Sequence, residues 1–260
     1  MNASAPLPTL FLAHGSPMLA LDGEAWGQAL TAFSRVQVRP RAILVCTAHW
    51  EAHGPFRLSS AAQPGVMHDF GGFPEALYQL DYPAPGSPVL AAQAAQLLRA
   101  AGLDVVLDDQ RPLDHGTWVP LRYLAPEADI PVVQLSLPRP RTPEQLLAAG
   151  RALAPLRREG VIIVGSGGIV HNLGRLDWAG AAAPRPWATA FDGWVREQLE
   201  RGDATALADW RGAPGAAESV PTSEHFDPLF VALGAAESAP TSLFSGWQLG
   251  SLSLASYCFS

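Results

Sequence analysis

Lysine is absent from this sequence, in which all 17 basic residues are arginine. Three kinds of catalytic group are therefore excluded: a Schiff-base lysine, the phosphate-binding lysine of a P-loop, and a serine–lysine dyad. Any catalysis must come from histidine, carboxylate, serine, tyrosine or arginine side chains, or from a bound metal.

The sequence also has few cysteines, no long apolar run and no net positive charge. Of the two cysteines, Cys46 lies in an apolar run that predicts a buried strand, so we expect no structural disulfide with Cys258 and a cytoplasmic location. No apolar run approaches the roughly 20 residues of a membrane helix, and the N-terminus lacks the features of a secretory signal. A net charge of −7 argues against nucleic-acid and anionic membrane partners.

The remaining pattern alternates apolar strands with punctuated helices. Such alternation, without internal repeats or a long linker, predicts one α/β domain over residues 1–260, with a central, largely parallel sheet flanked by helices. The active site is expected at the carboxyl edge of the strands. The expected strands are 10–13, 42–49, 56–60, 105–107, 132–137, 161–164 and 251–259. The expected helices are 26–34, 88–101, 143–158, 186–201 and 228–236.

Residues 63–86 interrupt this alternation with a long segment rich in glycine, proline and aromatic residues. Loops of this length inside a compact domain are usually lids or binding loops. We therefore expect the segment to lie over a site, although its aromatic residues fit ordinary loop packing equally well.

Three histidines follow apolar strands. His14 comes after the first strand, His49 ends the second, and His171 follows a glycine-rich turn after residues 161–164. Parallel strands bring their carboxyl ends to one edge, so these side chains are expected to meet, and converging neutral imidazoles suit a divalent transition metal. His115, in another loop after a strand, is a candidate to join them, whereas His53 and His68 are more simply structural histidines.

The motifs of other enzyme classes are incomplete or absent in this sequence. The run G-S-G-G-I-V at 165–170 lacks the third glycine of a dinucleotide fingerprint, and it is not the G-x-S-x-G of a nucleophile elbow. The sequence has no H-E-x-x-H, and two cysteines are too few for a cysteine-rich zinc site.

Six motifs run in order along the chain: H-G-S-P, T-A-H-W, H-D-F-G-G-F-P with Y-P-A-P-G, D-H-G-T-W-V-P-L, G-S-G-G-I-V-H-N-L and S-E-H-F-D-P-L. Together they resemble the class III, LigB-type extradiol ring-cleavage dioxygenases, in the branch of proteins similar to 4,5-DOPA extradiol dioxygenases. The resemblance spans nearly the whole chain and implies a mononuclear non-haem Fe(II) site that uses O2 to cleave a catechol.

The resemblance also implies roles for individual residues. His14, His49 and His225 match the metal ligands, and His171 matches the histidine that moves protons and is an additional ligand candidate. Where the wider superfamily supplies a carboxylate ligand, this chain offers His225 beside Glu224. Adjacent residues of an extended segment point in opposite directions, so we expect only one of them to reach the metal, with Glu224 the rival. Zn(II) suits three such ligands as well as Fe(II).

The implied reaction opens a catechol, DOPA-like or otherwise, to a semialdehyde. His171 would act as base and then acid, and His115 would hydrogen-bond the substrate or the oxygen adduct. Ser16, Phe73 and Tyr78 are the expected substrate-binding residues. Two other interpretations stay open: a zinc-dependent hydrolase or amidase that uses the same histidines, and a metal-binding protein without catalysis.

Overall fold

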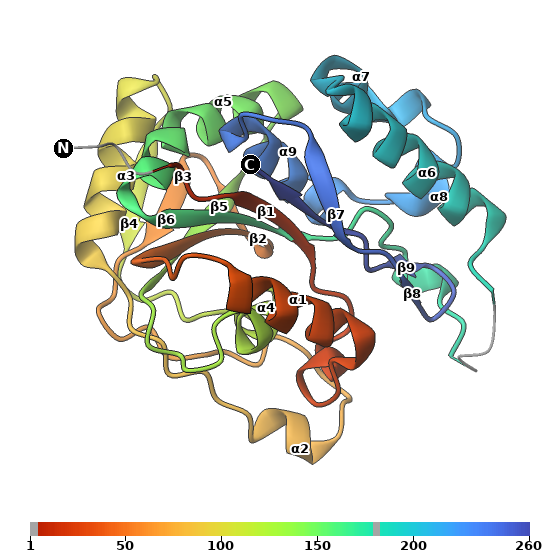
Figure 1. Ribbon diagram of the computed structural model, residues 1–260, viewed down its shortest axis with the longest axis horizontal. Helices are drawn as coiled ribbons and strands as arrows, with labels where there is room; N and C mark the ends of the chain where they lie inside the picture. The colour runs from red at the N-terminus through yellow and green to blue at the C-terminus, as the bar shows by residue number, and fades with distance from the viewer. Residues whose placement is uncertain (1–4, 179–182) are drawn as a thin grey trace.

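The computed structural model describes residues 5–178 and 183–260 (Figure 1). Within these ranges an eight-stranded sheet has the order β4-β3-β5-β2-β6-β1-β10-β7. Its strands are β1 (Thr9–Ala13), β2 (Ala42–His53), β3 (Phe56–Ser59), β4 (Val105–Asp108), β5 (Val132–Arg139), β6 (Val161–Gly167), β7 (Pro240–Phe244) and β10 (Ser256–Phe259). Two short strands, β8 (Trp247–Gln248) and β9 (Leu252–Ser253), form a separate hairpin.

The centre of the sheet is parallel, as predicted. β5, β2, β6 and β1 run side by side in the same direction, and β10 and β7 add an antiparallel edge. The central strands are buried apolar runs, as expected for strands covered on both faces. Because β1, β2 and β6 are parallel neighbours, their carboxyl ends lie together.

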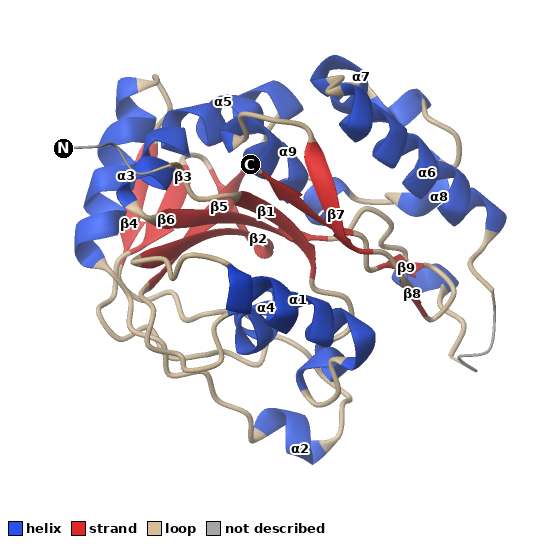
Figure 2. Ribbon diagram, viewed as in Figure 1, coloured by secondary structure: helices blue, strands red, loops and turns tan. Residues whose placement is uncertain are grey.

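Helices cover both faces of the sheet (Figure 2). α3, α5 and α9 pack on one face with α6 beside them, and α1 and α4 pack on the other, each layer over its own apolar core. The helices are α1 (Glu24–Val36), α2 (Glu75–Tyr78), α3 (Pro88–Ala100), α4 (His115–Leu124), α5 (Pro143–Leu153), α6 (Pro186–Arg201), α7 (Ala204–Ala208), α8 (Ala216–Ser219) and α9 (Pro228–Ala235). This arrangement is the predicted single α/β domain. None of the helices in the described ranges has the length and apolar character needed to cross a membrane.

Local sequence signals place several helix ends. The Ser87 hydroxyl accepts a hydrogen bond from the Leu90 amide at the start of α3, and the Thr142 hydroxyl caps α5 in the same way. α5 ends at Leu153, earlier than predicted, and a 3-10 helix continues over Ala154–Glu159. Pro155 explains the change, because it has no N–H to donate to the carbonyl of Arg151.

Two other boundaries differ from prediction near the strand ends. β2 does not stop at His49 but continues to His53, with irregular pairing to β5 between Cys46 and Glu51. Such an irregularity re-aims side chains next to it, here the imidazole of His49. His115 lies not in a loop but at the first position of α4, which the Asp114 carboxylate caps through the Thr117 amide.

The predicted C-terminal strand 251–259 is two strands. β9 belongs to the hairpin with β8, whereas β10 joins the main sheet beside β1. Between them the Ser253 hydroxyl accepts a hydrogen bond from the Ala255 amide, and the Leu254 amide donates to the carbonyl of Gly246. These bonds turn the chain and take both amides out of a continuous ladder.

Candidate metal centre

Five histidines meet at the carboxyl edge of the central strands. The His14 ring centre lies 4.9 Å from that of His49 and 5.3 Å from that of His225, and His49 and His225 are 5.0 Å apart. His115 lies 3.9 Å from His49, and His171 stacks on His225 at 3.4 Å. All five line one cavity of about 380 Å³. The structure thus brings together every histidine that the sequence singled out for chemistry.

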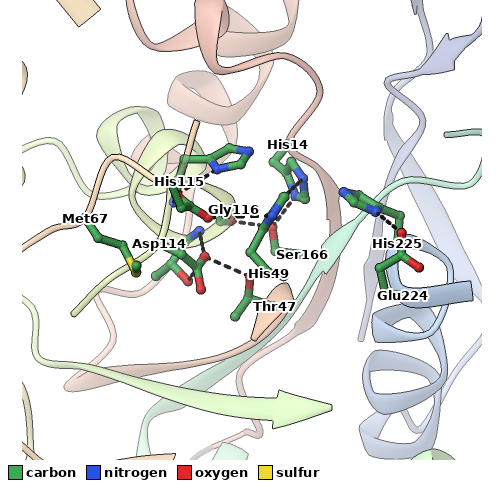
Figure 3. A network of polar contacts seen from close by, with 12 residues as sticks. His14, Thr47, His49, Met67, Asp114, His115, Gly116, Ser166, Glu224 and His225 are labelled. Atoms are coloured by element: carbon green, nitrogen blue, oxygen red, sulfur yellow. Dashed lines mark hydrogen bonds and ion pairs between the residues drawn. The ribbon is translucent and has the colours of Figure 1, made fainter. Parts of the chain in front are cut away.

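Three of these imidazoles have the spacing of metal ligands. One nitrogen atom from each of His14, His49 and His225 lies within 4.8 Å of the other two. The Nε2 atoms of His14 and His49 are 3.0 Å apart and face each other (Figure 3).

The far side of the His14 ring is held by Ser166. The Ser166 hydroxyl donates a short hydrogen bond to the carbonyl of Gly116, so its oxygen is free to accept from His14 Nδ1, 3.0 Å away. His14 therefore carries its proton on Nδ1, and its Nε2 lone pair points into the cluster. This pattern is typical of metal-binding histidines, whose second nitrogen donates to a fixed acceptor.

Carboxylates hold the other two rings. His225 Nδ1 donates to Glu224 Oε1 at 3.0 Å, and Asp69 Oδ2 lies 3.6 Å from His49 Nδ1. Among the described residues, the buried Nε2 of His225 has no hydrogen-bond partner. An unpartnered buried nitrogen is costly in a folded protein, but a metal ion between the three Nε2 atoms would satisfy it. The residues present therefore fit a divalent transition metal.

Glu224 and His225 do not point in opposite directions, contrary to the expectation for an extended segment. They lie in a 3-10 helix, Ser223–His225, in which the carboxylate of Glu224 contacts the imidazole of its neighbour. This contact favours His225 over Glu224 as ligand, with Glu224 orienting the ring.

Burial keeps the cluster neutral. Loss of hydration lowers the pKa of His14 and of His225 well below the usual value, and the neighbouring histidines lower both further. The same cause, with the neighbouring His115, lowers the pKa of His49 to about 3. Neutral imidazoles keep the lone pairs that a metal requires.

The glycines at the end of β6 let the His225 segment approach closely. The Gly168 amide donates to the His225 carbonyl at 2.8 Å, and the Gly167 carbonyl accepts from the His14 amide at 3.1 Å. A Cβ at Gly167 would collide with the His225 carbonyl oxygen. The G-S-G-G run thus serves close packing between two candidate ligands and not nucleotide binding.

Asp69 connects the long loop to the cluster and was not among the predicted site residues. Its Oδ1 accepts from both the backbone amide and the Nδ1 of His115, each at 2.9 Å. Burial opposes ionisation of this carboxyl group, but the hydrogen bonds from His115 outweigh it and lower its pKa to about 2. The sequence signal was weak: Asp69 is one of three carboxylates in residues 63–86 and stands beside His68 and Phe70.

Two of the three predicted substrate-binding residues line the cavity and the third does not. Ser16 and Phe73 line the cavity, together with Phe70. Tyr78 is not among the described residues that line it: its ring packs against Phe70 at 5.3 Å, and the Phe73 amide donates to its hydroxyl oxygen at 3.4 Å. Tyr78 therefore packs behind Phe70 and does not line the cavity, since the one-turn helix α2 turns its ring toward Phe70 and His68.

The remaining two histidines lie apart from the cluster. The Nε2 of His68 bonds the carbonyl of Leu80 at 3.0 Å, and its ring packs against Phe70 and Trp118, so it braces the loop. His53 is exposed at the end of β2.

Comparisons with known proteins agree on one family. Residues 8–259 match the model of the catalytic LigB subunit of aromatic ring-opening dioxygenases. The chain is 40% identical to 4,5-DOPA dioxygenase extradiol of Escherichia coli (strain K12) over 98% of this chain and 95% of that protein. It is also 40% identical to the protein of the same name from Beta vulgaris, over 96% of each. The crystal structure of an uncharacterized protein from Escherichia coli K12 superposes with a TM-score of 0.85 at 35% identity, covering 98% of this chain and 100% of that one.

Proposed function

This chain belongs to the LigB family and is an extradiol ring-cleavage dioxygenase, and we propose that it uses Fe(II), bound by His14, His49 and His225, to insert both atoms of O2 into a catechol. One observation carries the metal assignment. Each of the three rings has an acceptor beside its Nδ1, and the Nε2 atoms converge, that of His225 without a partner among the described residues.

Bound Fe(II) would hold the two catechol oxygens and O2 close together, lower the pKa of the catechol hydroxyl groups and supply the redox chemistry that Zn(II) lacks. Zn(II) fits the same three nitrogens, so a purified sample is able to carry zinc without turnover. The overall reaction breaks the ring C–C bond next to the two hydroxyl-bearing carbons. Both oxygen atoms remain in a ring-opened semialdehyde.

His171 is the proposed proton carrier. Its ring lies parallel to that of His225, with an angle of 7° between their planes, and faces the cavity. Burial, reinforced by the neighbouring His49, lowers its pKa to about 4, so its imidazole is neutral at pH 7 and has a lone pair that would accept the catechol proton. The same nitrogen would later act as an acid and return that proton to the reacting oxygen atoms.

His115 is the proposed second contact to the substrate. An ionised Asp69 only accepts hydrogen bonds, so His115 carries a proton on Nδ1 and offers Nε2 to a catechol hydroxyl group. Phe73 and Ser16 would border the ring, while Tyr78 supports Phe73. The proposal includes a cytoplasmic location, for which both free cysteines, Cys46 and Cys258, are suited.

The test is anaerobic loading with Fe(II), followed by a panel of catechols that includes L-DOPA, the substrate named for the relatives. An oxygen electrode and the absorbance of the yellow semialdehyde would be read together. We expect one O2 consumed per product formed, and no O2 uptake by Zn(II)-loaded protein. Retained iron without O2 uptake on any catechol would refute the proposal, and ester or amide hydrolysis by the zinc form would support the hydrolase instead.

The ligand assignment has its own control within the chain. His14→Ala should abolish stoichiometric metal binding, whereas His68→Ala, which removes a loop histidine outside the cluster, should retain it. Full iron content in His14→Ala, measured by atomic absorption, would show that the ligands are other residues.

A further inference from the structure

The cavity continues beyond the histidines as an apolar wall, which we define as Leu173, Leu176, Trp178, Leu249 and Leu252. Two segments build it: the stretch after His171, and the β8–β9 hairpin on the side of the molecule away from α3 (Figure 1). Trp178 is 76% exposed, so part of this wall is an apolar surface open to solvent beside the catalytic histidines. Exposed apolar patches of this kind commonly mark binding grooves.

The hairpin tip carries a leucine where the backbone favours another residue. Leu249 has φ +49° and the following Gly250 has φ +71°, and the Ser251 amide donates to the Gln248 carbonyl across them. A two-residue turn with positive φ at both central positions prefers Asn-Gly, because a leucine there is strained. A residue that is held in a strained backbone conformation beside a cavity points to a function for that residue.

Neighbouring segments hold this tip in place. The Asp177 amide donates to the Leu249 carbonyl at 2.8 Å, and the Arg185 amide donates to that of Gly250 at 3.0 Å. On the other side, the Ser16 amide donates to Gln248 Oε1 at 2.9 Å, which connects the hairpin to the loop after His14. The position of Leu249 relative to the candidate metal is therefore set by three hydrogen bonds.

The cavity has room for more than a bare ring. An engineered protein cavity of about 150 Å³ is large enough for benzene, whereas this one measures about 380 Å³. The carboxylate of Asp69 lines it, and the described lining residues include no arginine, in a chain without lysine. A carboxylate on the substrate would lose water here and find no fixed cation, whereas an apolar substituent would gain contacts.

We propose that the apolar wall binds the ring substituent of the substrate, and that the preferred substrates are catechols bearing an alkyl or aryl group in place of a carboxylated side chain. The proposal rests on the proposed ring-cleavage function and specifies its substrate class. Leu249 is then a specificity residue, placed to contact the substituent while the catechol oxygens face the histidines.

The test compares kcat/KM of the Fe(II)-loaded enzyme for catechol, 4-propylcatechol, 3-(3,4-dihydroxyphenyl)propanoate and L-DOPA. Each buried methylene is expected to add about fourfold, so 4-propylcatechol should exceed catechol by about 10- to 50-fold. The kcat/KM for 4-propylcatechol should also exceed that for the propanoate, its carboxylated counterpart, by at least about tenfold. Calorimetry with Zn(II)-loaded protein under nitrogen should give the same order of affinities without turnover, with a negative heat-capacity change for 4-propylcatechol.

Leu249→Asn removes the leucine side chain from the apolar wall without harming the turn, because asparagine suits the turn better than leucine does. We expect the ratio of kcat/KM for 4-propylcatechol over catechol to fall about five- to tenfold. Ala128→Gly is the matched control: it relieves another positive φ, +50°, outside the cavity lining, and should leave the ratio unchanged.

The outcomes separate the two proposals. Cleavage of every catechol with no preference for 4-propylcatechol, or with a preference for the propanoate, overturns the wall assignment and leaves ring cleavage standing. Absence of O2 uptake on all four compounds overturns the ring-cleavage proposal, and the substrate class with it.

Discussion

Replacing Gly167 with alanine should damage the metal site without touching a ligand side chain. Gly167 ends β6, and its carbonyl accepts from the His14 amide while the next amide holds the His225 carbonyl. To restore a 3.0 Å contact with an added Cβ, the His225 carbonyl oxygen would have to retreat by about 1 Å. Both atoms belong to the backbone, so no side-chain rotation relieves the collision.

The magnitude follows from the tolerance of metal bonds. Ligand distances in protein sites hold to within about 0.2 Å, and loss of a group that only orients a ligand already costs about 10- to 100-fold in metal affinity. We expect the affinity of Gly167→Ala for Fe(II) or Zn(II) to fall at least about 100-fold, together with about 1–3 kcal/mol of stability from overpacking.

The assay is competition with a chelator of known affinity, alongside thermal unfolding of the metal-free protein. The matched control is Gly193→Ala in α6, where an added Cβ meets nothing within 4 Å. This control should gain about 0.5–1 kcal/mol of stability, since alanine is the better helix former, and should bind metal normally. Metal affinity of Gly167→Ala within threefold of the parent protein would refute the reasoning that this close approach sets the position of His225.

Three further predictions concern Asp69 and His171 in the cluster and Asp192 in α6. Asp69→Asn should weaken metal binding about 10- to 100-fold, because an amide has a single acceptor oxygen and cannot face the N–H groups of both His49 and His115. Chelator competition that shows unchanged affinity would contradict this, and Asp108→Asn serves as control. His171→Ala should retain metal but lose about 10²- to 10⁴-fold in kcat, so parent-like turnover in an oxygen electrode would remove its acid–base role. Burial raises the pKa of Asp192 above its ordinary 3.8, so folding is penalised fully above the folded pKa and not at all below 3.8. Asp192→Asn should therefore raise Tm at pH 7 and lose that gain below about pH 4, and a gain that persists at pH 3 would show that ionisation is not the cause.

The parts predicted from sequence share one physical property: they depend on neighbours in the chain. Apolar runs ending in His14 and His49 predicted parallel strands that meet at one edge, and the caps at Ser87 and Thr142 predicted two helix starts. The structure agrees, because a buried parallel strand and a capped helix are both defined by a few consecutive residues.

The two wrong boundaries have different causes. His115 was assigned to a loop, whereas Asp114 caps a helix that begins at His115 and continues through Pro120. The predicted strand stopped at His49, where the pairing with β5 is irregular. In the structure this pairing resumes beyond the irregularity, so β2 continues. At His115 a local cap decided the boundary, whereas at His49 the tertiary pairing with β5 outweighed the local pattern.

The sequence by itself determined the α/β class and the edge of the sheet at which the histidines converge. Only the tertiary structure decided how those rings are held. Ser166 holds His14 across 152 residues, Asp69 reaches His115 across 46, and Gln248 binds the Ser16 amide across 232. Spacing along the chain says nothing about such pairs, because only the folded chain brings them within hydrogen-bond distance. The same holds for Leu249, whose strained turn is set against the cavity by residues far from it in sequence.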